Sequence, residues 1–194
     1  GFKFILATPI ILAVLTLDMF AVFFGGAESL LPAVVEKVLN AGSIEFGWLR
    51  SAHGIGSLVM LFFLSSLPLL KSRVGFKLLG SVAMFGVCII IFGLSKNIYL
   101  SFGILMIGGA FDAVSMVIRQ SILQFKTPEH LKGRVSSVNS IFVSSSNELG
   151  AFESGVAASL LGLVPAILFG GTMTIITVIV IAISIKAIRR VKLE

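Results

Sequence analysis

The sequence predicts an all-α integral membrane protein with six transmembrane helices. Of its 194 residues, 57% are hydrophobic and only 12% are charged, whereas an average soluble domain is about 25% charged. A soluble core of this size could not bury so much apolar surface, so the surplus must face lipid. A bilayer core of about 30 Å is crossed by about 20 apolar residues per helix, and the long apolar runs of this chain meet that length.

The first apolar run covers residues 4–26 and contains Asp18. Residues 27–39 remain largely apolar, so this helix can continue past Gly25-Gly26 with a bend there and near Pro32. The other five spans are expected at residues 46–69, 75–95, 98–125, 136–161 and 166–188.

Two segments carry signals for helix ends. Thr127-Pro128-Glu129 is typical of a helix start, with Thr as the N-cap, Pro at the first position and an acid in the first turn. The uncharged stretch that follows Ser154 is too long for one span, and Gly162 with Pro165 divides it.

The distribution of basic residues predicts the orientation in the membrane, because cytoplasmic loops are enriched in Lys and Arg. If six helices alternate, eleven of these residues fall on one side: Lys3, Lys71, Arg73, Lys77, Lys126, Lys132, Arg134, Lys186, Arg189, Arg190 and Lys192. The opposite side has only Lys37 and Lys96. Both termini are therefore expected in the cytoplasm.

Polar residues within the spans follow a pattern that repeats once. Charges inside a membrane are costly and usually face a water-filled cavity or a partner. They occur in the first span (Asp18, Glu28), the second (Arg50, His53), the fourth (Asp112, Arg119) and the fifth (Glu148, Glu153, with Asn139 and Asn147), but not in the third or sixth. This pattern predicts two three-helix units, residues 1–96 and 97–194, each with its third helix facing lipid. Because three is odd, the second unit is inverted.

The internal likeness between the two units is short. Gly25-Gly26-Ala27 matches Gly108-Gly109-Ala110. A separate row in the fifth span, Ser146, Gly150, Ser154, Ala158 and Gly162, recurs every four residues and lets another helix approach closely. The row is explained either by tight packing within the chain or by a sliding contact with a second bundle.

Arg50 requires an acidic partner, and the sequence leaves two choices. Glu28 lies at a similar depth if the first helix continues past its glycines, and Asp18 is the choice if it ends there. His53 is a candidate for lining a cavity or relaying protons, and otherwise is a hydrogen-bonded packing residue. Glu28, His53 and Asn147 are candidates for a cavity or its mouth. Arg50 and Arg119 are candidates for transport or gating. The structural alternative for Arg119 is that its side chain reaches the cytoplasmic interface along its apolar stem.

Several classes of function are disfavoured. The basic residues are not gathered on one face with aromatics, which argues against nucleic-acid binding. Cys88 is the single cysteine, so no intrachain disulfide or cysteine metal cluster can form. Gly54-Ile55-Gly56 lacks the strand of a dinucleotide fingerprint, and no phosphate-binding loop, paired-histidine metal motif or nucleophile elbow is present. We expect no enzymatic activity, no cofactor and no metal.

Residues 127–136 and 146–155 resemble the junction between the tenth and eleventh helices of bacterial major facilitator permeases. The branch most similar is that of the enterobactin exporters, which Gly47-Trp48-Leu49-Arg50 and the segment from Asp112 to Arg119 also resemble. Lys71-Ser72-Arg73 is a weaker likeness, since it lacks the acid of the family's loop motif. The resemblance covers essentially the whole chain as the second six of twelve helices, which fits a first residue that is Gly and not Met.

The resemblance implies a carrier of the bacterial inner membrane that works by alternating access. Its partners would be the lipid bilayer and an N-terminal six-helix half, and it would export a small amphipathic molecule or siderophore with the proton gradient. The rival interpretation is a six-helix protein that acts alone as a self-assembling channel or membrane scaffold.

Proton coupling requires a group that binds and releases protons as its environment changes between dry and hydrated. The acids available are Asp18, Glu28, Asp112, Glu148 and Glu153, of which Glu28 is nearest the outer mouth. Glu153 lies about 140° around the helix from Glu148. Asp112 and Glu148, both near mid-membrane, are the predicted pair, and hydrogen bonding between helices is their alternative role.

Overall fold

A computed structural model describes residues 2–66, 74–185 and 188, and this part of the chain is helical with no strand. The first crossing is divided into α1 (Phe2–Ala7), α2 (Pro9–Phe24), the 3₁₀ helix η1 (Gly26–Leu30) and α3 (Leu31–Lys37). The others are α4 (Ser43–Ser66), α5 (Val74–Leu94), α6 (Ile98–Lys126), α7 (Lys132–Leu161) and α8 (Leu163–Ser184), with η3 (Glu129–Leu131) before α7. The six predicted helical segments are therefore present.

Five of these segments are long and apolar enough to cross a membrane: Pro9–Lys37, α4, α5, α6 and α8. The 30-residue α7 is long enough but is not in this set. Its many serines and its charges at Glu148 and Glu153 interrupt the apolar stretches. A sixth crossing is thus indicated by the place of α7 in the bundle, where it packs on α2 and α8, more than by its composition.

The first crossing bends where the sequence predicts it. At Gly25 a side chain would meet the carbonyl oxygen of Ala21, and the chain continues as η1. Pro32 then stands in the first turn of α3, where its missing N–H group costs no helical hydrogen bond. The bend carries Glu28 on η1, between the two α-helical parts.

The two predicted helix-end signals have different outcomes. Gly162 has a φ of 92°, which favours glycine, and separates α7 from α8 as predicted. The expected N-cap role of Thr127 is wrong: it terminates α6 in an extended conformation, and its buried hydroxyl has no partner among the described residues. The α-helix begins at Lys132, after η3.

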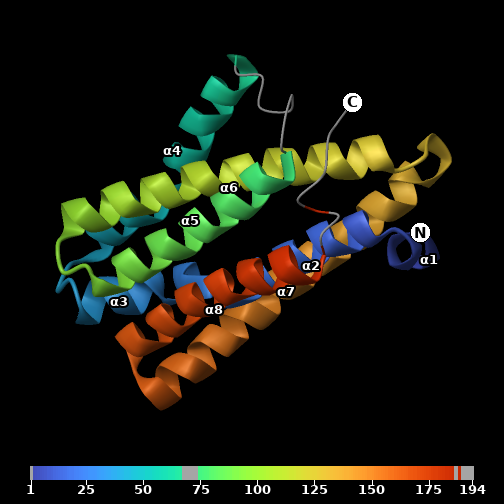
Figure 1. Cartoon of the computed structure of the whole chain (residues 1–194). Helices are drawn as coiled ribbons and strands as arrows, with labels where there is room; N and C mark the ends of the chain where they lie inside the picture. Colours follow the sequence, from blue (N-terminus) through green and yellow to red (C-terminus); the bar gives the residue numbers. More distant parts are fainter. Residues whose placement is uncertain (1, 67–73, 186–187, 189–194) are drawn as a thin grey trace.

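The bundle has two ends and two sides. Helix α1 and the α6–α7 connection lie at one end, whereas the α3–α4, α5–α6 and α7–α8 connections lie at the other (Figure 1). Of the predicted basic side, Lys71, Arg73, Lys186, Arg189, Arg190 and Lys192 lie outside the described residues. Lys126, Lys132 and Arg134 flank the α6–α7 connection, opposite the end that carries Lys37 and Lys96.

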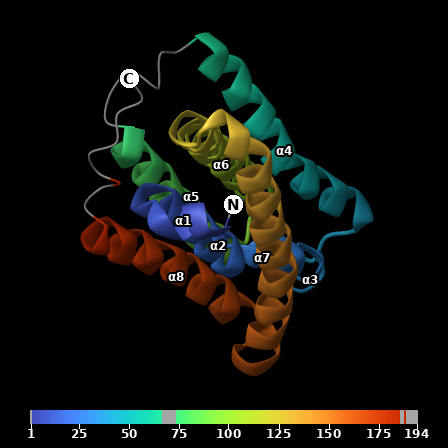
Figure 2. The same ribbon diagram turned by 90° about the vertical axis from the view of Figure 1, so that its right-hand side faces the viewer.

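Viewed along the bundle, α5 and α8 lie on one side, α4 and α7 on the other, and α2 and α6 between them (Figure 2). The extensive helix pairs are α4–α6, α5–α6, α5–α8, α2–α7 and α2–α8. On the α5–α8 side, Ile91 and Ile179 are exposed apolar residues. Both helices thus present apolar side chains on this side, and their contact with lipid stays a prediction.

Glycines set the closest contacts between helices. A side chain at Gly56 in α4 would collide with the carbonyl oxygen of Met106 in α6. In the small-residue row of α7, an added carbon at Gly150 would stand 2.7 Å from the carbonyl oxygen of Phe23 in α2. Ser146, Gly150 and Ser154 are buried, so this part of the row packs tightly within the chain.

Candidate functional site

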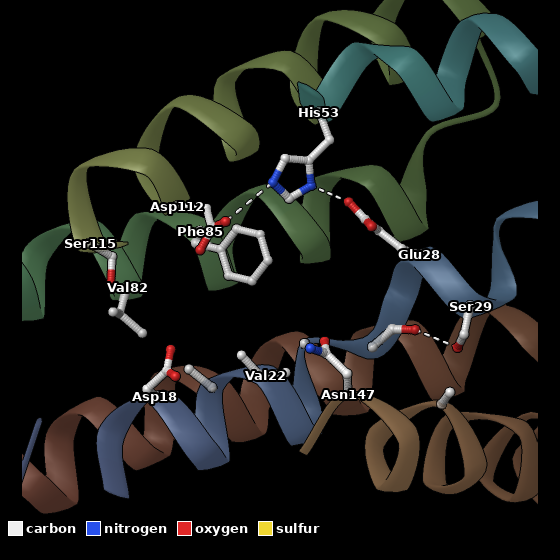
Figure 3. Close-up of a pocket in the computed structure, with 14 residues that line it drawn as sticks. Asp18, Val22, Glu28, Ser29, His53, Val82, Phe85, Asp112, Ser115 and Asn147 are labelled. Atoms are coloured by element: carbon white, nitrogen blue, oxygen red, sulfur yellow. Dashed lines mark hydrogen bonds and ion pairs between the residues drawn. The ribbon is translucent and has the colours of Figure 1, made fainter. Parts of the chain in front are cut away.

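A cavity of about 290 Å³ lies in the middle of the bundle. Residues of α2, η1, α4, α5, α6 and α7 line it: Asp18, Ala21, Val22, Gly25, Gly26, Glu28, Ser29, His53, Val82, Phe85, Asp112, Ser115, Asn147 and Ala151. Five of them, Asp18, Glu28, His53, Asp112 and Asn147, are candidates from the sequence (Figure 3). The fold thus brings together polar side chains from helices that are distant along the chain.

His53 stands between two carboxylates (Figure 3). Its Nδ1 contacts Oε1 of Glu28 on η1, and its Nε2 lies 3.4 Å from Oδ2 of Asp112 on α6. The His53 side chain is 21% exposed, whereas those of Glu28 and Asp112 are 58% and 45% exposed. One imidazole therefore links η1, α4 and α6 at the open cavity.

The number of hydrogen bonds that His53 can donate to the two carboxylates depends on its protonation state. A protonated imidazole donates from both ring nitrogens and can serve both carboxylates. A neutral imidazole has one N–H, so one carboxylate must then carry a proton itself or lose its hydrogen bond. The group Glu28–His53–Asp112 can hold a proton in one state and lose a contact between helices when the proton leaves.

Close packing of α4 on α6 positions His53. The missing side chain of Gly109 leaves room for the backbone carbonyl and ring of His53. Ser57, one turn later on α4, donates a hydrogen bond to the Gly109 carbonyl at 2.9 Å. The ring of Phe85 on α5 is tilted against that of His53, with centroids 6.1 Å apart. The imidazole is held by backbone contacts on one side and an aromatic ring on another.

Asp18 and Arg119 form a second ionic contact, a buried pair between α2 and α6. Their side chains are 8% and 10% exposed, respectively. Arg119 therefore points into the bundle and not to the interface, so the snorkelling interpretation is wrong. Its Nε is buried without a partner in the described part of the chain. Asp18 also lines the cavity, so this ion pair borders the site.

Arg50 is not paired as either alternative predicted. Asp18 is occupied by Arg119, and no acidic side chain of the described chain lies within ion-pair distance of Arg50. Its guanidinium lies over the ring of Phe46, 5.9 Å from the centroid. Arg50, Glu28 and His53 line a neighbouring cavity of about 330 Å³. Arg50 thus adds positive charge beside the His53 group without a direct bond.

Glu148 and Glu153 are not brought into the central cavity. Neither lines it, although Asn147 and Ala151 of the same helix do. Glu148 is exposed and Glu153 is half-buried. The predicted pairing of Asp112 with Glu148 therefore has no contact to support it, because the neighbour of Asp112 is His53.

The sequence did not point to the cavity residues of α5. Val82 and Phe85 line the site from a helix that the charge pattern assigns to lipid. They are apolar, so no polar signal could have marked them. Ser29 and Ser115 are small polar residues of a kind that occurs throughout the chain. Among the described residues, no group of three or more His, Cys, Asp or Glu side chains is arranged to hold a metal ion.

Comparison with known proteins gives one match. Residues 1–193 match the protein family described as transmembrane secretion effector. No curated protein and no solved structure matches the chain.

Proposed function

Because the chain belongs to the transmembrane secretion effector family, a family of major facilitator type, we propose that it is the C-terminal half of a proton-coupled exporter. The transported compound is a small amphipathic molecule or a siderophore. The observation that carries the coupling proposal is the position of His53 between Glu28 and Asp112 at a cavity inside the bundle. Ionisable groups inside a membrane are costly and usually mark functional positions, which supports a role for these three residues.

In this proposal the His53 group is the proton site. With its proton, the imidazole holds η1, α4 and α6 together through both carboxylates. Without it, one carboxylate loses its donor and favours hydration, which opens the cavity on that side. The Asp18–Arg119 ion pair stays formed whether His53 is protonated or neutral, and it holds α2 against α6 beside the cavity. Asp112 keeps the coupling role that the sequence suggests, with His53 as its partner in place of Glu148.

Alternating access is proposed to use two inverted repeats, and three correspondences between the two units support this. Gly56 lies on the carbonyl of Met106, and Gly150 lies on that of Phe23. Phe23 stands three residues before Gly26, and Met106 stands three residues before Gly109. Gly26 and Gly109 are equivalent positions in the matched Gly-Gly-Ala segments.

A second pair of glycine contacts and a pair of cavity residues extend the match. Gly86 of α5 and Gly171 of α8 each face the other's carbonyl oxygen, at 3.1 and 2.9 Å from the added carbon, as at a two-fold axis. His53 stands three residues before Gly56 on α4, and Asn147 stands three residues before Gly150 on α7. Both side chains line the cavity. The repeats would therefore contribute His53 and Asn147 as equivalent residues.

The exposed side of α4 and α7 is the proposed contact with the N-terminal half. Both helices lie on the side away from α5 and α8 (Figure 2). They carry large exposed apolar residues, including Phe62 and Phe63 on α4 and Leu149 and Phe152 on α7. A self-assembling channel or scaffold would use the same surface against a second copy, so the transport experiment separates the two proposals.

We expect His53→Asn and Asp112→Asn to reduce proton-driven transport by about 100-fold or more, the scale on which a positioned acid–base group contributes. The measurement is uptake of ethidium and of a catecholate siderophore into proteoliposomes of the full-length protein, with and without an imposed pH gradient. Exchange at equal pH should persist in both variants.

Glu148→Gln is the matched control, because Glu148 is an intramembrane acid outside the cavity. Full pH-dependent transport by both His53→Asn and Asp112→Asn would assign proton coupling to another part of the carrier. An uptake rate that does not saturate with increasing concentration of either compound would favour the channel.

The proposed orientation has both termini in the cytoplasm of a bacterium with this chain in its inner membrane. Lys96→Cys, at the α5–α6 connection, should react with an impermeant maleimide in intact cells. His130→Cys, in η3, should react only after permeabilisation. Cys88 is buried, so the unmodified chain is the background control, and external labelling at position 130 would reverse the orientation.

A further inference from the structure

A groove of about 460 Å³ lies between the first turns of α4 and α6. It belongs to the end of the bundle opposite the α6–α7 connection (Figure 1). Its walls include Ile44, Glu45 and Trp48 of α4 and Tyr99 and Phe102 of α6. Trp48 and Tyr99 are the single tryptophan and the single tyrosine of the sequence. Both are therefore placed in one groove, away from the proposed proton site.

The two rings are open to the surroundings. Trp48 is 63% exposed and Tyr99 is 79% exposed. Tryptophan and tyrosine favour the level of the lipid headgroups, where their apolar rings and polar edges are both satisfied. Such anchoring explains aromatic residues at this depth.

Glu45 adds a carboxylate to the aromatic groove. Its Oε2 accepts a hydrogen bond from the Gly42 backbone N–H at 2.9 Å, which caps the start of α4. In the described chain, no Lys, Arg or His lies within ion-pair distance of this carboxylate. Its second oxygen remains available. The groove thus combines aromatic faces with an unneutralised negative charge, the combination that binds ammonium groups.

A positive charge lies at the same end of α6. Lys96 is exposed, stands three residues before Tyr99 in the sequence, and has no acidic partner among the described residues. A zwitterionic headgroup could place its ammonium against the rings and Glu45 and its phosphate toward Lys96. The apolar wall at Ile44, which is 73% exposed, would follow the acyl chain.

We propose that this groove binds a membrane phospholipid with an ammonium headgroup. The bilayer supplies such a lipid at the depth of the aromatic residues, and the charges of Glu45 and Lys96 match its two ends. This site is separate from the His53 cavity and does not depend on proton coupling.

The fluorescence of Trp48 provides the test. The detergent-solubilised protein is titrated with dihexanoyl phosphatidylethanolamine and, separately, with dihexanoyl phosphatidylglycerol, which has the same chains and no ammonium. Phosphatidylethanolamine should give a saturable change in the fluorescence of Trp48. The variant Trp48→Phe, which removes this fluorophore, supplies the background signal. Glu45→Gln and Tyr99→Ala should each weaken binding by about tenfold, through the lost charge or ring.

The variants are chosen to keep the fold intact. Glutamine at position 45 can still accept the Gly42 hydrogen bond, and Tyr99 is largely exposed. Phe125→Ala, an exposed aromatic at the other end of α6, is the control and should bind as the wild type does. Equal responses to both lipids, or no effect of Glu45→Gln, would reduce the groove to an aromatic anchor. Binding of decyltrimethylammonium but not phosphatidylethanolamine would overturn the lipid assignment in favour of a free amphipathic cation.

Discussion

Arg119→Met is expected to destabilise the bundle by about 3 to 5 kcal/mol, because it leaves the buried Asp18 carboxylate without its counter-charge. The two side chains are among the least exposed charged groups of the described chain. A charge with so little exposed surface keeps most of its desolvation cost when its partner is removed. The free energy of unfolding can be measured by equilibrium denaturation in mixed micelles, followed by circular dichroism.

The double variant Asp18→Leu/Arg119→Met should recover most of that loss. Replacing both ions with apolar residues of similar volume removes the cost of the unpaired charge. Lys132→Met is the matched control: Lys132 pairs with Glu129 at 2.6 Å, but both side chains are well exposed. Loss of such a surface pair should cost less than about 1 kcal/mol. A double variant as unstable as the sum of the single variants would refute the pairing.

Gly56→Ala is expected to destabilise the protein by at least about 1 to 3 kcal/mol, the usual cost of overpacking. The added methyl group would collide with the Met106 carbonyl oxygen. That atom is backbone and cannot move aside without separating α4 from α6. His53 stands one turn before Gly56, so its position between Glu28 and Asp112 should also be lost. Proton-driven transport is therefore expected to fall together with stability.

Gly54→Ala supplies the control within the same helix. A side chain at Gly54 would meet no atom within 4 Å, and alanine favours the helix over glycine by about 1 kcal/mol. The two substitutions are chemically identical and two residues apart, yet should change the free energy of unfolding in opposite directions. Equal effects in the same denaturation assay would contradict the close approach of α4 and α6.

Much of the helical architecture could be predicted from the sequence alone. The apolar runs, the glycine and proline bends at Gly25-Gly26 and Pro32, and the break at Gly162 are all local signals. A span must satisfy its own backbone hydrogen bonds in lipid, so its length and ends are encoded in its own residues. The same local chemistry marked Asp18, Glu28, His53, Asp112 and Asn147 as candidates, since polar residues in apolar spans are few.

The partners of those residues were decided by the tertiary structure. The sequence left Arg50 with two possible acids and paired Asp112 with Glu148 by depth, but Asp18 contacts Arg119 and Asp112 contacts His53. A pairing between helices depends on how each helix is rotated and shifted against its neighbour. Backbone contacts at Gly56, Gly109 and Gly150 set that geometry, and their partners are distant in the sequence. Depth can be counted along one helix, whereas the facing residue exists only after the helices have packed.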